Sequence, residues 1–170
     1  MAKNKSLKDL VAQGSTGAVR RVKEGETAEV RFLFEPSDQS DDGRDLWVVL
    51  GSYWDEELKR SIYVELDDDY KSDASVKVRK NYFTVAYDTE SQTVNVWELR
   101  YKLMQSLSNY EEEYDTITDR NYKLKRKGKG IADTDYIATP LAPKPMNKKM
   151  EKAKRECQGM LDAVIEQLVG

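Results

Sequence analysis

Apolar and polar residues alternate along several short stretches of this chain, and a period of two is typical of β-strands with one buried face. The stretch Thr27–Phe34 shows the pattern clearly, with Ala28, Val30 and Phe32 on one side. Pro36 ends it, because proline cannot donate a ladder hydrogen bond. The pattern predicts strands at residues 27–34, 46–50, 62–66, 79–87, 93–98, 120–127 and 135–139.

Between the predicted strands at residues 93–98 and 120–127, the period of the apolar residues changes to about four, which indicates an amphipathic helix. Leu99, Leu103 and Leu107 form its apolar stripe. The acidic run Glu111–Glu113 would oppose the negative C-terminal end of a helix. We therefore predict a helix from residue 99 to about Asn109.

Two further helices are predicted near the ends of the chain. An apolar stripe over residues 147–168 follows the stiff proline linker Pro140–Pro145. We expect this C-terminal helix to fold back on the sheet, and self-association or docking on a protein partner are the alternatives. Ser6–Gln13 predicts a short N-terminal helix that is ordered only if it docks.

From Arg79 to Pro140 the predicted order is strand, strand, helix, basic strand, strand. An OB-fold, a five-stranded β-barrel, places its helix at the same point, between the third and fourth strands. We therefore predict a mainly β protein with an OB-fold barrel over residues 26–142. Residues 1–25 would form an N-terminal arm, and residues 143–170 would form the linker and C-terminal helix.

Composition narrows the possible functions. The chain has 170 residues, of which 39% are hydrophobic and 35% charged, so we expect a small core and a large solvated surface. It contains no histidine and only Cys157, which excludes the usual zinc sites and histidine-based catalysis. With no apparent signal peptide or membrane span, we expect a cytoplasmic protein without enzymatic activity or cofactor.

The acidic triplet Asp67–Asp69 is the one candidate metal site, because carboxylates suit Mg²⁺ or Ca²⁺. It lacks the glycine and the glutamate that an EF-hand loop needs at fixed positions. We interpret it as a solvated acidic turn and predict no metal. A metal-dependent nuclease using these carboxylates is the weaker alternative.

The net charge of -3 conceals a strong segregation of charge along the chain. Residues 35–73 contain 13 acidic and four basic side chains, whereas residues 120–129 contain six basic and no acidic ones. Residues 144–155 carry another six basic side chains against Glu151 alone. Such concentration indicates a local binding site for a polyanion, although a solvated face is the ordinary alternative.

The strand phases predict that aromatic rings and cations share one face of the sheet. Cations bind phosphates, and flat rings stack on unpaired bases, so this face would bind single-stranded nucleic acid. The alternative for each ring is ordinary packing in a core. On this face we place Lys80, Tyr82, Trp97, Lys123, Lys125 and Lys127, and we predict further phosphate contacts from Arg120, Arg126 and Lys129.

A resemblance to a known family adds to this interpretation. Several segments, spread over roughly residues 5–142, together resemble the phage single-stranded DNA-binding (helix-destabilising) proteins. They are Ser6–Leu10, Val30–Leu33, Tyr82–Asp88, Val94–Leu99, Asp119–Gly130 and Thr134–Tyr136 followed by Pro140.

The resemblance implies an OB-fold that coats single-stranded DNA during phage replication and recombination, with replication proteins as possible partners of the C-terminal helix. Many members carry a Cys/His zinc subdomain and an acidic tail, and this sequence has neither. The alternative function is a phage adaptor or regulatory protein that binds a protein partner through the barrel and the C-terminal helix.

Overall fold

The computed structural model describes residues 19–66, 78–128 and 135–169. Its elements are β1 (Val19–Arg20), β2 (Thr27–Phe32), β3 (Trp47–Asp55), β4 (Arg60–Glu65), β5 (Arg79–Asp88), β6 (Thr93–Arg100), α2 (Tyr101–Tyr114), β7 (Arg120–Lys127), β8 (Asp135–Pro143), α3 (Lys148–Glu156) and α4 (Met160–Val169). The predicted helix at Ser6–Gln13, the triplet Asp67–Asp69 and Lys129 lie outside the described residues.

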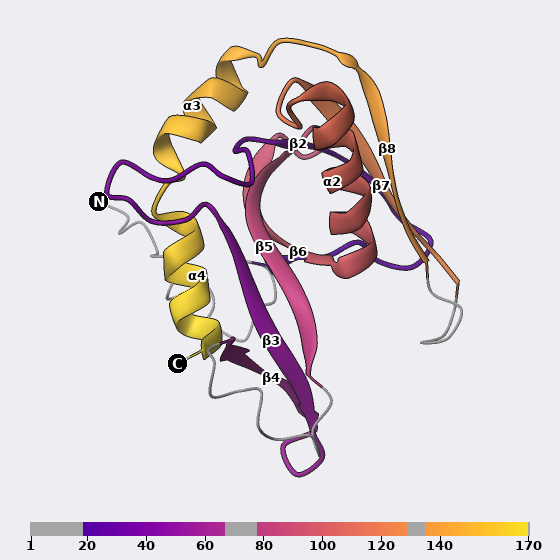
Figure 1. Cartoon of the computed structure of the whole chain (residues 1–170), viewed down its shortest axis with the longest axis vertical. Coiled ribbons are helices and arrows are strands. Elements are labelled where there is room, and N and C mark those ends of the chain that lie inside the picture. Colours follow the sequence, from indigo (N-terminus) through magenta and orange to yellow (C-terminus); the bar gives the residue numbers. More distant parts are fainter. Residues whose placement is uncertain (1–18, 67–77, 129–134, 170) are drawn as a thin grey trace.

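The strands form one curved sheet in the order β1-β6-β5-β2-β7-β8 (Figure 1). Strand β3 also pairs with β5, and β4 extends this pairing as a hairpin. The predicted fold class is confirmed: the chain is mainly β, with a barrel-like sheet, helix α2 between β6 and β7, and a helical C-terminal segment. The tight turn between β5 and β6 forms because Asp88 accepts hydrogen bonds from the backbone N–H groups of Glu90 and Ser91.

Two apolar cores lie on opposite sides of β5 and β6. Inside the barrel, the buried residues come from the inner face of the strands and from Leu103 and Leu107 of α2. On the outer side, Phe83, Val85 and Val96 pack under α3 and α4, which cover this face in Figure 1. Each large apolar side chain buried in this way stabilises the fold by about 1.5–3 kcal/mol.

The C-terminal segment folds back on the sheet as predicted, but its local structure differs from the prediction. It forms two helices, because the chain turns at residues 157–159 with Met160 N donating to Cys157 O at 3.0 Å. The linker prediction was wrong, since β8 extends through the prolines to Pro143. Buried Met150, Leu161 and Val164 occupy the apolar stripe, so docking on a partner through it would require the helices to detach.

Helix α2 begins later and ends later than predicted. It continues past Glu111–Glu113 to Tyr114, whose ring contacts the Arg120 guanidinium at the start of β7. The Tyr110 hydroxyl donates to Ala138 O at 3.0 Å, and the rings of Tyr110 and Tyr114 stack. Asp115 then ends the helix in the left-handed conformation.

A buried arginine joins three parts of the chain. Arg31 of β2 donates to Thr118 O at 2.8 Å, to Asn121 Oδ1 at 3.3 Å and to Lys144 O at 2.6 Å. Burial lowers the pKa of Arg31, although neighbouring Asp119 opposes that effect. These bonds tie the barrel to the segment that leads into α3.

The predicted boundary between an arm and the barrel at residue 25 was wrong. Val19 and Val22 are buried, and β1 pairs in parallel with β6. Residues 19–26 therefore form part of the barrel wall. Within the described ranges, no helix has the length and apolar character needed to cross a membrane.

Candidate nucleic-acid interface

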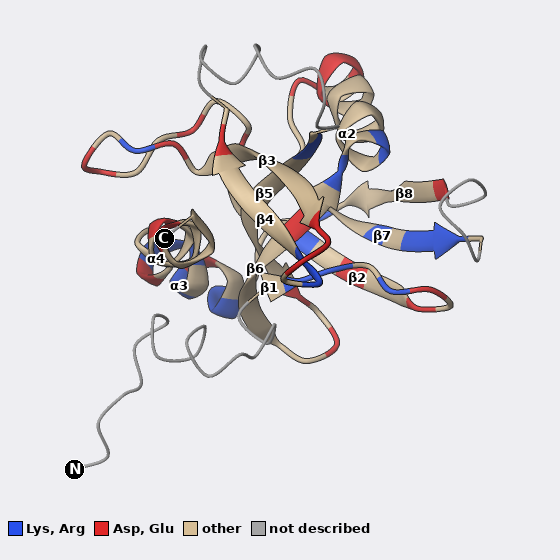
Figure 2. Cartoon of the chain, turned by 90° about the horizontal axis from the view of Figure 1, so that it is seen from below, with Lys and Arg blue, Asp and Glu red and all other residues tan. Residues whose placement is uncertain are grey.

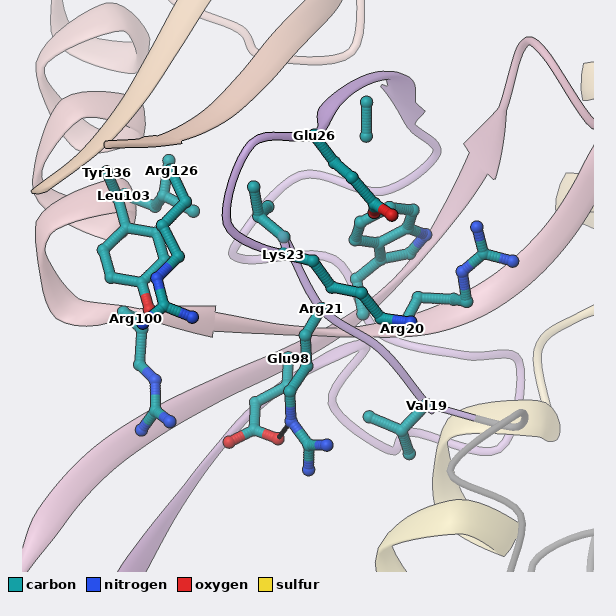
Figure 3. Close-up of a pocket in the computed structure, with 13 residues that line it drawn as sticks. Val19, Arg20, Arg21, Lys23, Glu26, Glu98, Arg100, Leu103, Arg126 and Tyr136 are labelled. Carbon is teal, nitrogen blue, oxygen red and sulfur yellow. Dashed lines mark hydrogen bonds and ion pairs between the residues drawn. The ribbon is translucent and has the colours of Figure 1, made fainter. Parts of the chain in front are cut away.

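A cleft of about 470 Å³ opens in the barrel wall where β6 and β8 do not pair with each other (Figure 3). Residues 19–26 form one of its sides, and the start of α2 lies beside β6. The ends of β7 and β8 contribute Arg126 and Tyr136. We call this space the cationic cleft, because its lining includes Arg20, Arg21, Lys23, Arg100 and Arg126.

Two carboxylates, Glu26 and Glu98, also line the cleft, so its formal charge is five minus two, or +3. Glu98 is buried and pairs with Arg21, whose Nε lies 2.6 Å from its Oε2. The Tyr63 hydroxyl accepts from Arg21 Nη2 at 3.0 Å and donates to the same carboxylate. Burial opposes the charge of Arg21, but Glu98 and Tyr63 outweigh it and raise the pKa of Arg21. This ion pair is therefore structural, and the other cations of the cleft are Arg20, Lys23, Arg100 and Arg126.

Arg100 is held in place by a short chain of hydrogen bonds. Its Nη1 donates to Asn81 Oδ1 at 2.7 Å, and Asn81 Nδ2 donates to Ser52 Oγ at 2.7 Å. Asn81 and Ser52 are both buried, so this support is shielded from water. Arg100 also immediately precedes α2, which has no acidic residue in its first turn. The positive end of the helix dipole thus adds to the charge near the cleft.

Two cleft residues carry buried donors that lack an acceptor. Trp97 is only 1% exposed, and its Nε1 has no hydrogen-bond partner. Arg126 Nε is likewise buried and unpartnered, while the Arg126 guanidinium lies 5.9 Å from the centre of the Tyr136 ring. Arg20 lies over the Trp97 ring at 5.7 Å and is 3.5 Å from Asp88.

Trp97 and Tyr82 share one face of the sheet, as predicted, but that face is the inside of the barrel. Trp97 lies opposite Thr84, and Tyr82 lies opposite Leu99. Trp97 packs in the inner core, and partly buried Tyr82 packs against that core. The prediction that Trp97 presents a free stacking surface was therefore wrong.

The predicted lysines lie on the other side of the barrel wall. Tyr122 and Leu124 of β7 point into the inner core, so the alternate residues Lys123, Lys125 and Lys127 are exposed outside it. We call these three lysines the outer row. Figure 2 shows the basic end of β7 projecting from the barrel. The prediction that the rings and the lysines share one face was therefore wrong. Both sides of β5 and β6 are apolar. The prediction assigned to the barrel interior the side that in fact packs under α3 and α4.

Arg120 is not available to a ligand, contrary to its predicted role. It is 8% exposed, and it donates two hydrogen bonds to Asp119 at 2.8 and 2.9 Å. Its guanidinium lies 3.9 Å from the centre of the Tyr114 ring. The hydrogen bond from Arg120 lowers the pKa of Asp119, which keeps this pair charged. Arg120 therefore stabilises the start of β7.

Sequence reasoning missed most of the cationic cleft. The run Arg20-Arg21-Val22-Lys23 was the available signal, but it was assigned to the arm. Tyr101 was also missed: it is 58% exposed at the start of α2. Burial and, to a lesser extent, Tyr101 raise the pKa of Tyr82, and Tyr101 directly follows Arg100 in the chain. Lys80, which is exposed on β5, lies two residues before Tyr82 in the chain.

Neither the protein-family models nor the curated proteins include a match for this sequence. The resemblance to phage single-stranded DNA-binding proteins therefore remains a prediction from the quoted segments. The residues that the structure describes contain no group of three or more acidic or cysteine side chains placed to hold a metal ion.

Proposed function

We propose that this protein binds single-stranded nucleic acid, with single-stranded DNA as the expected ligand, and that the cationic cleft is the centre of the site. The observation that carries the proposal is the gathering of Arg20, Lys23, Arg100 and Arg126 around one opening in a chain whose net charge is -3. A polyanion is the ligand that such a cleft attracts most strongly.

Unpaired bases are favoured over a duplex by the rings beside the cleft. Tyr101 is exposed and Tyr82 partly so, and flat rings can stack only on bases that are not already paired. Lys80 and the outer row extend the cationic surface away from the cleft. The binding is passive, with phosphates held by charge and bases by stacking. Coating of DNA in phage replication and recombination, which the resemblance implies, belongs to the same proposal.

The proposal is tested by titrating the protein with oligo-dT and with a duplex of the same length at two salt concentrations. Intrinsic fluorescence is a suitable signal because the chain has three tryptophans, including Trp97 at the cleft. We expect the single strand to change the fluorescence and the duplex to have little effect. Affinity should fall with salt by about 0.7 log units per log unit of salt for each phosphate contacted. No response to oligo-dT at low salt would contradict the proposal.

A further inference from the structure

We infer that the inner face of the β3–β4 hairpin is a platform on which unpaired bases of the bound strand stack. The inference rests on the proposed function and extends it from the rings beside the cationic cleft to a second surface outside that cleft. We call this surface the base platform. Its residues are Val49, Gly51, Tyr53, Ile62, Val64, Leu66, Val78, Lys80 and Tyr82.

The strand register places the residues of the base platform together. Val49 lies opposite Tyr82 in the antiparallel pairing of β3 with β5, so both side chains are on the same face, and Tyr82 packs against the inner core. Two residues further along β3, Gly51 lies between Val64 of β4 and Lys80 of β5. The base platform therefore continues the inner face of the barrel outward, and Figure 1 shows β3, β4 and the start of β5 extending past α2.

The base platform is flat because its central residue has no side chain. A Cβ atom at Gly51 would lie 2.7 Å from Val78 Cγ1, 2.8 Å from Leu66 Cδ2 and 3.2 Å from Val64 Cγ2. These three side chains thus converge over Gly51 and fill the space that a larger residue would need. A flat apolar surface fits the planar face of a base, whereas the anchoring side chain of a protein partner needs a pocket to fill.

The two faces of the hairpin differ in their exposure to solvent. On the base platform, Val49 is 40% and Leu66 is 39% exposed. On the other face, Leu50 and Tyr63 pack in the core under α3 and α4. Covering Val49 and Leu66 with a base would remove apolar surface from water, which is favourable.

The charges around the base platform suit a nucleic acid. Lys80 is exposed beside Gly51, and no residue of the platform is acidic. Glu65 of β4 lies opposite Leu50, so its carboxylate is on the other face of the hairpin. Lys80 can therefore pair with a phosphate while the attached base lies on the apolar surface. Cations next to surfaces that stack bases are the combination by which proteins bind single strands.

Methyl signals in a ¹H–¹³C spectrum of the full chain provide the test, because the ring current of a stacked purine shifts nearby methyl protons. Val49→Ala and Leu66→Ala identify the platform signals by their loss. We expect oligo-dA to move the Val49 and Leu66 signals upfield and to leave those of buried Val85 in place. An oligonucleotide of the same length without bases should bind through its phosphates without moving the platform signals.

Affinity measurements with matched variants test the same point independently. Val49→Asn should weaken oligo-dT binding roughly five- to tenfold, which corresponds to one stacked base at the lower end of its usual contribution. It should leave the affinity for the base-free chain unchanged. Leu66→Asn provides a second variant if Val49→Asn folds poorly. Trp54→Ala is the control, because Trp54 is 56% exposed on the other face of the same hairpin, and it should change neither affinity.

Three results would overturn the base platform alone. The first is binding of oligo-dA with no movement of the Val49 and Leu66 signals, and the second is an equal movement caused by the base-free chain. The third is self-association in sedimentation experiments that Val49→Asn abolishes while oligo-dT affinity stays the same, which would assign the surface to a second copy of the chain. Absence of any oligonucleotide binding at low salt would instead overturn the proposed function, and the base platform with it.

Discussion

The two sides of strand β7 carry similar basic residues in very different settings. On the inner side, Arg126 follows Leu124 into the cationic cleft and stands against Tyr136. On the outer side, Lys123 and Lys125 are exposed. A pre-positioned guanidinium loses less side-chain entropy on binding than a free lysine does. The comparison suggests that the inner side fixes the ligand and that the outer side mainly raises the local concentration of polyanion.

The largest difference between the two sides should appear in stability. Leu124→Ala removes a side chain with no exposed surface, so we expect it to lower the free energy of unfolding by about 2–5 kcal/mol. Lys125→Ala changes an exposed neighbour and should alter the free energy of unfolding by less than about 0.5 kcal/mol. Urea denaturation of both variants measures the contrast. Equal losses would show that the assigned sides of β7 are wrong.

A second difference should appear in ligand affinity. Arg126→Gln removes charge-assisted hydrogen bonds worth about 1.5–3 kcal/mol, so oligo-dT should bind roughly 10- to 100-fold more weakly. Lys125→Gln removes one solvated charge and should weaken binding only a few-fold. Fluorescence titrations in the same buffer compare the two. If both substitutions had the same effect, the cleft would have no special role.

The outer row should contribute chiefly to the salt dependence of oligo-dT binding. Lys125→Glu combined with Lys127→Glu should lower oligo-dT affinity and flatten the plot of log affinity against log salt by about 1.4, two phosphate contacts at about 0.7 each. Titrations at four or more salt concentrations give this slope. An unchanged slope would mean that the bound strand does not reach the outer row.

The smallest effect concerns a buried hydroxyl on the inner side. Tyr122 OH has no partner, and burial raises the pKa of Tyr122. Tyr122→Phe should leave the free energy of unfolding unchanged or raise it by up to about 1 kcal/mol at neutral pH.

A pH series sharpens this last prediction. An unfolded tyrosine ionises near pH 10, whereas folded Tyr122 stays neutral to higher pH. Ionisation of this tyrosine therefore leaves the free energy of unfolding unchanged below about pH 10 and lowers it as the pH rises further. The native protein should lose more stability than Tyr122→Phe between pH 9 and pH 11 in urea denaturation. Parallel losses would indicate that Tyr122 reaches water.

Local patterns in the sequence predicted the strands well but did not show how they join. The alternation in β5, β6 and β7 correctly separated Phe83 from Tyr82 and Leu124 from Lys125. It could not tell which apolar face lies inside the barrel, because an amphipathic helix far along the chain covers the other. The burial of Trp97 was missed because Trp97 lies on the face that forms the barrel interior.

The cationic cleft was harder to predict, since its cations come from separate parts of the chain. Arg20 lies near Arg100 because β1 pairs in parallel with β6, and Lys23 lies near Arg126 because the adjacent Glu24 forms an isolated parallel bridge with Arg126. A parallel pairing of two residues has no periodicity that a sequence could show. Arg120, in contrast, was predicted to contact phosphate as part of the basic run, but its guanidinium donates to the neighbouring Asp119 carboxylate instead.

The joint around Arg31 makes the barrel and the two terminal helices one cooperative unit. Its guanidinium spans the carbonyl groups of Thr118 and Lys144, so separating α3 from the barrel would leave a buried charge with too few acceptors. A truncation before Pro145 would also strip the cover from Phe83 and Val85. The helices are thus an integral part of the fold, and a shortened chain would expose an apolar sheet surface that favours aggregation.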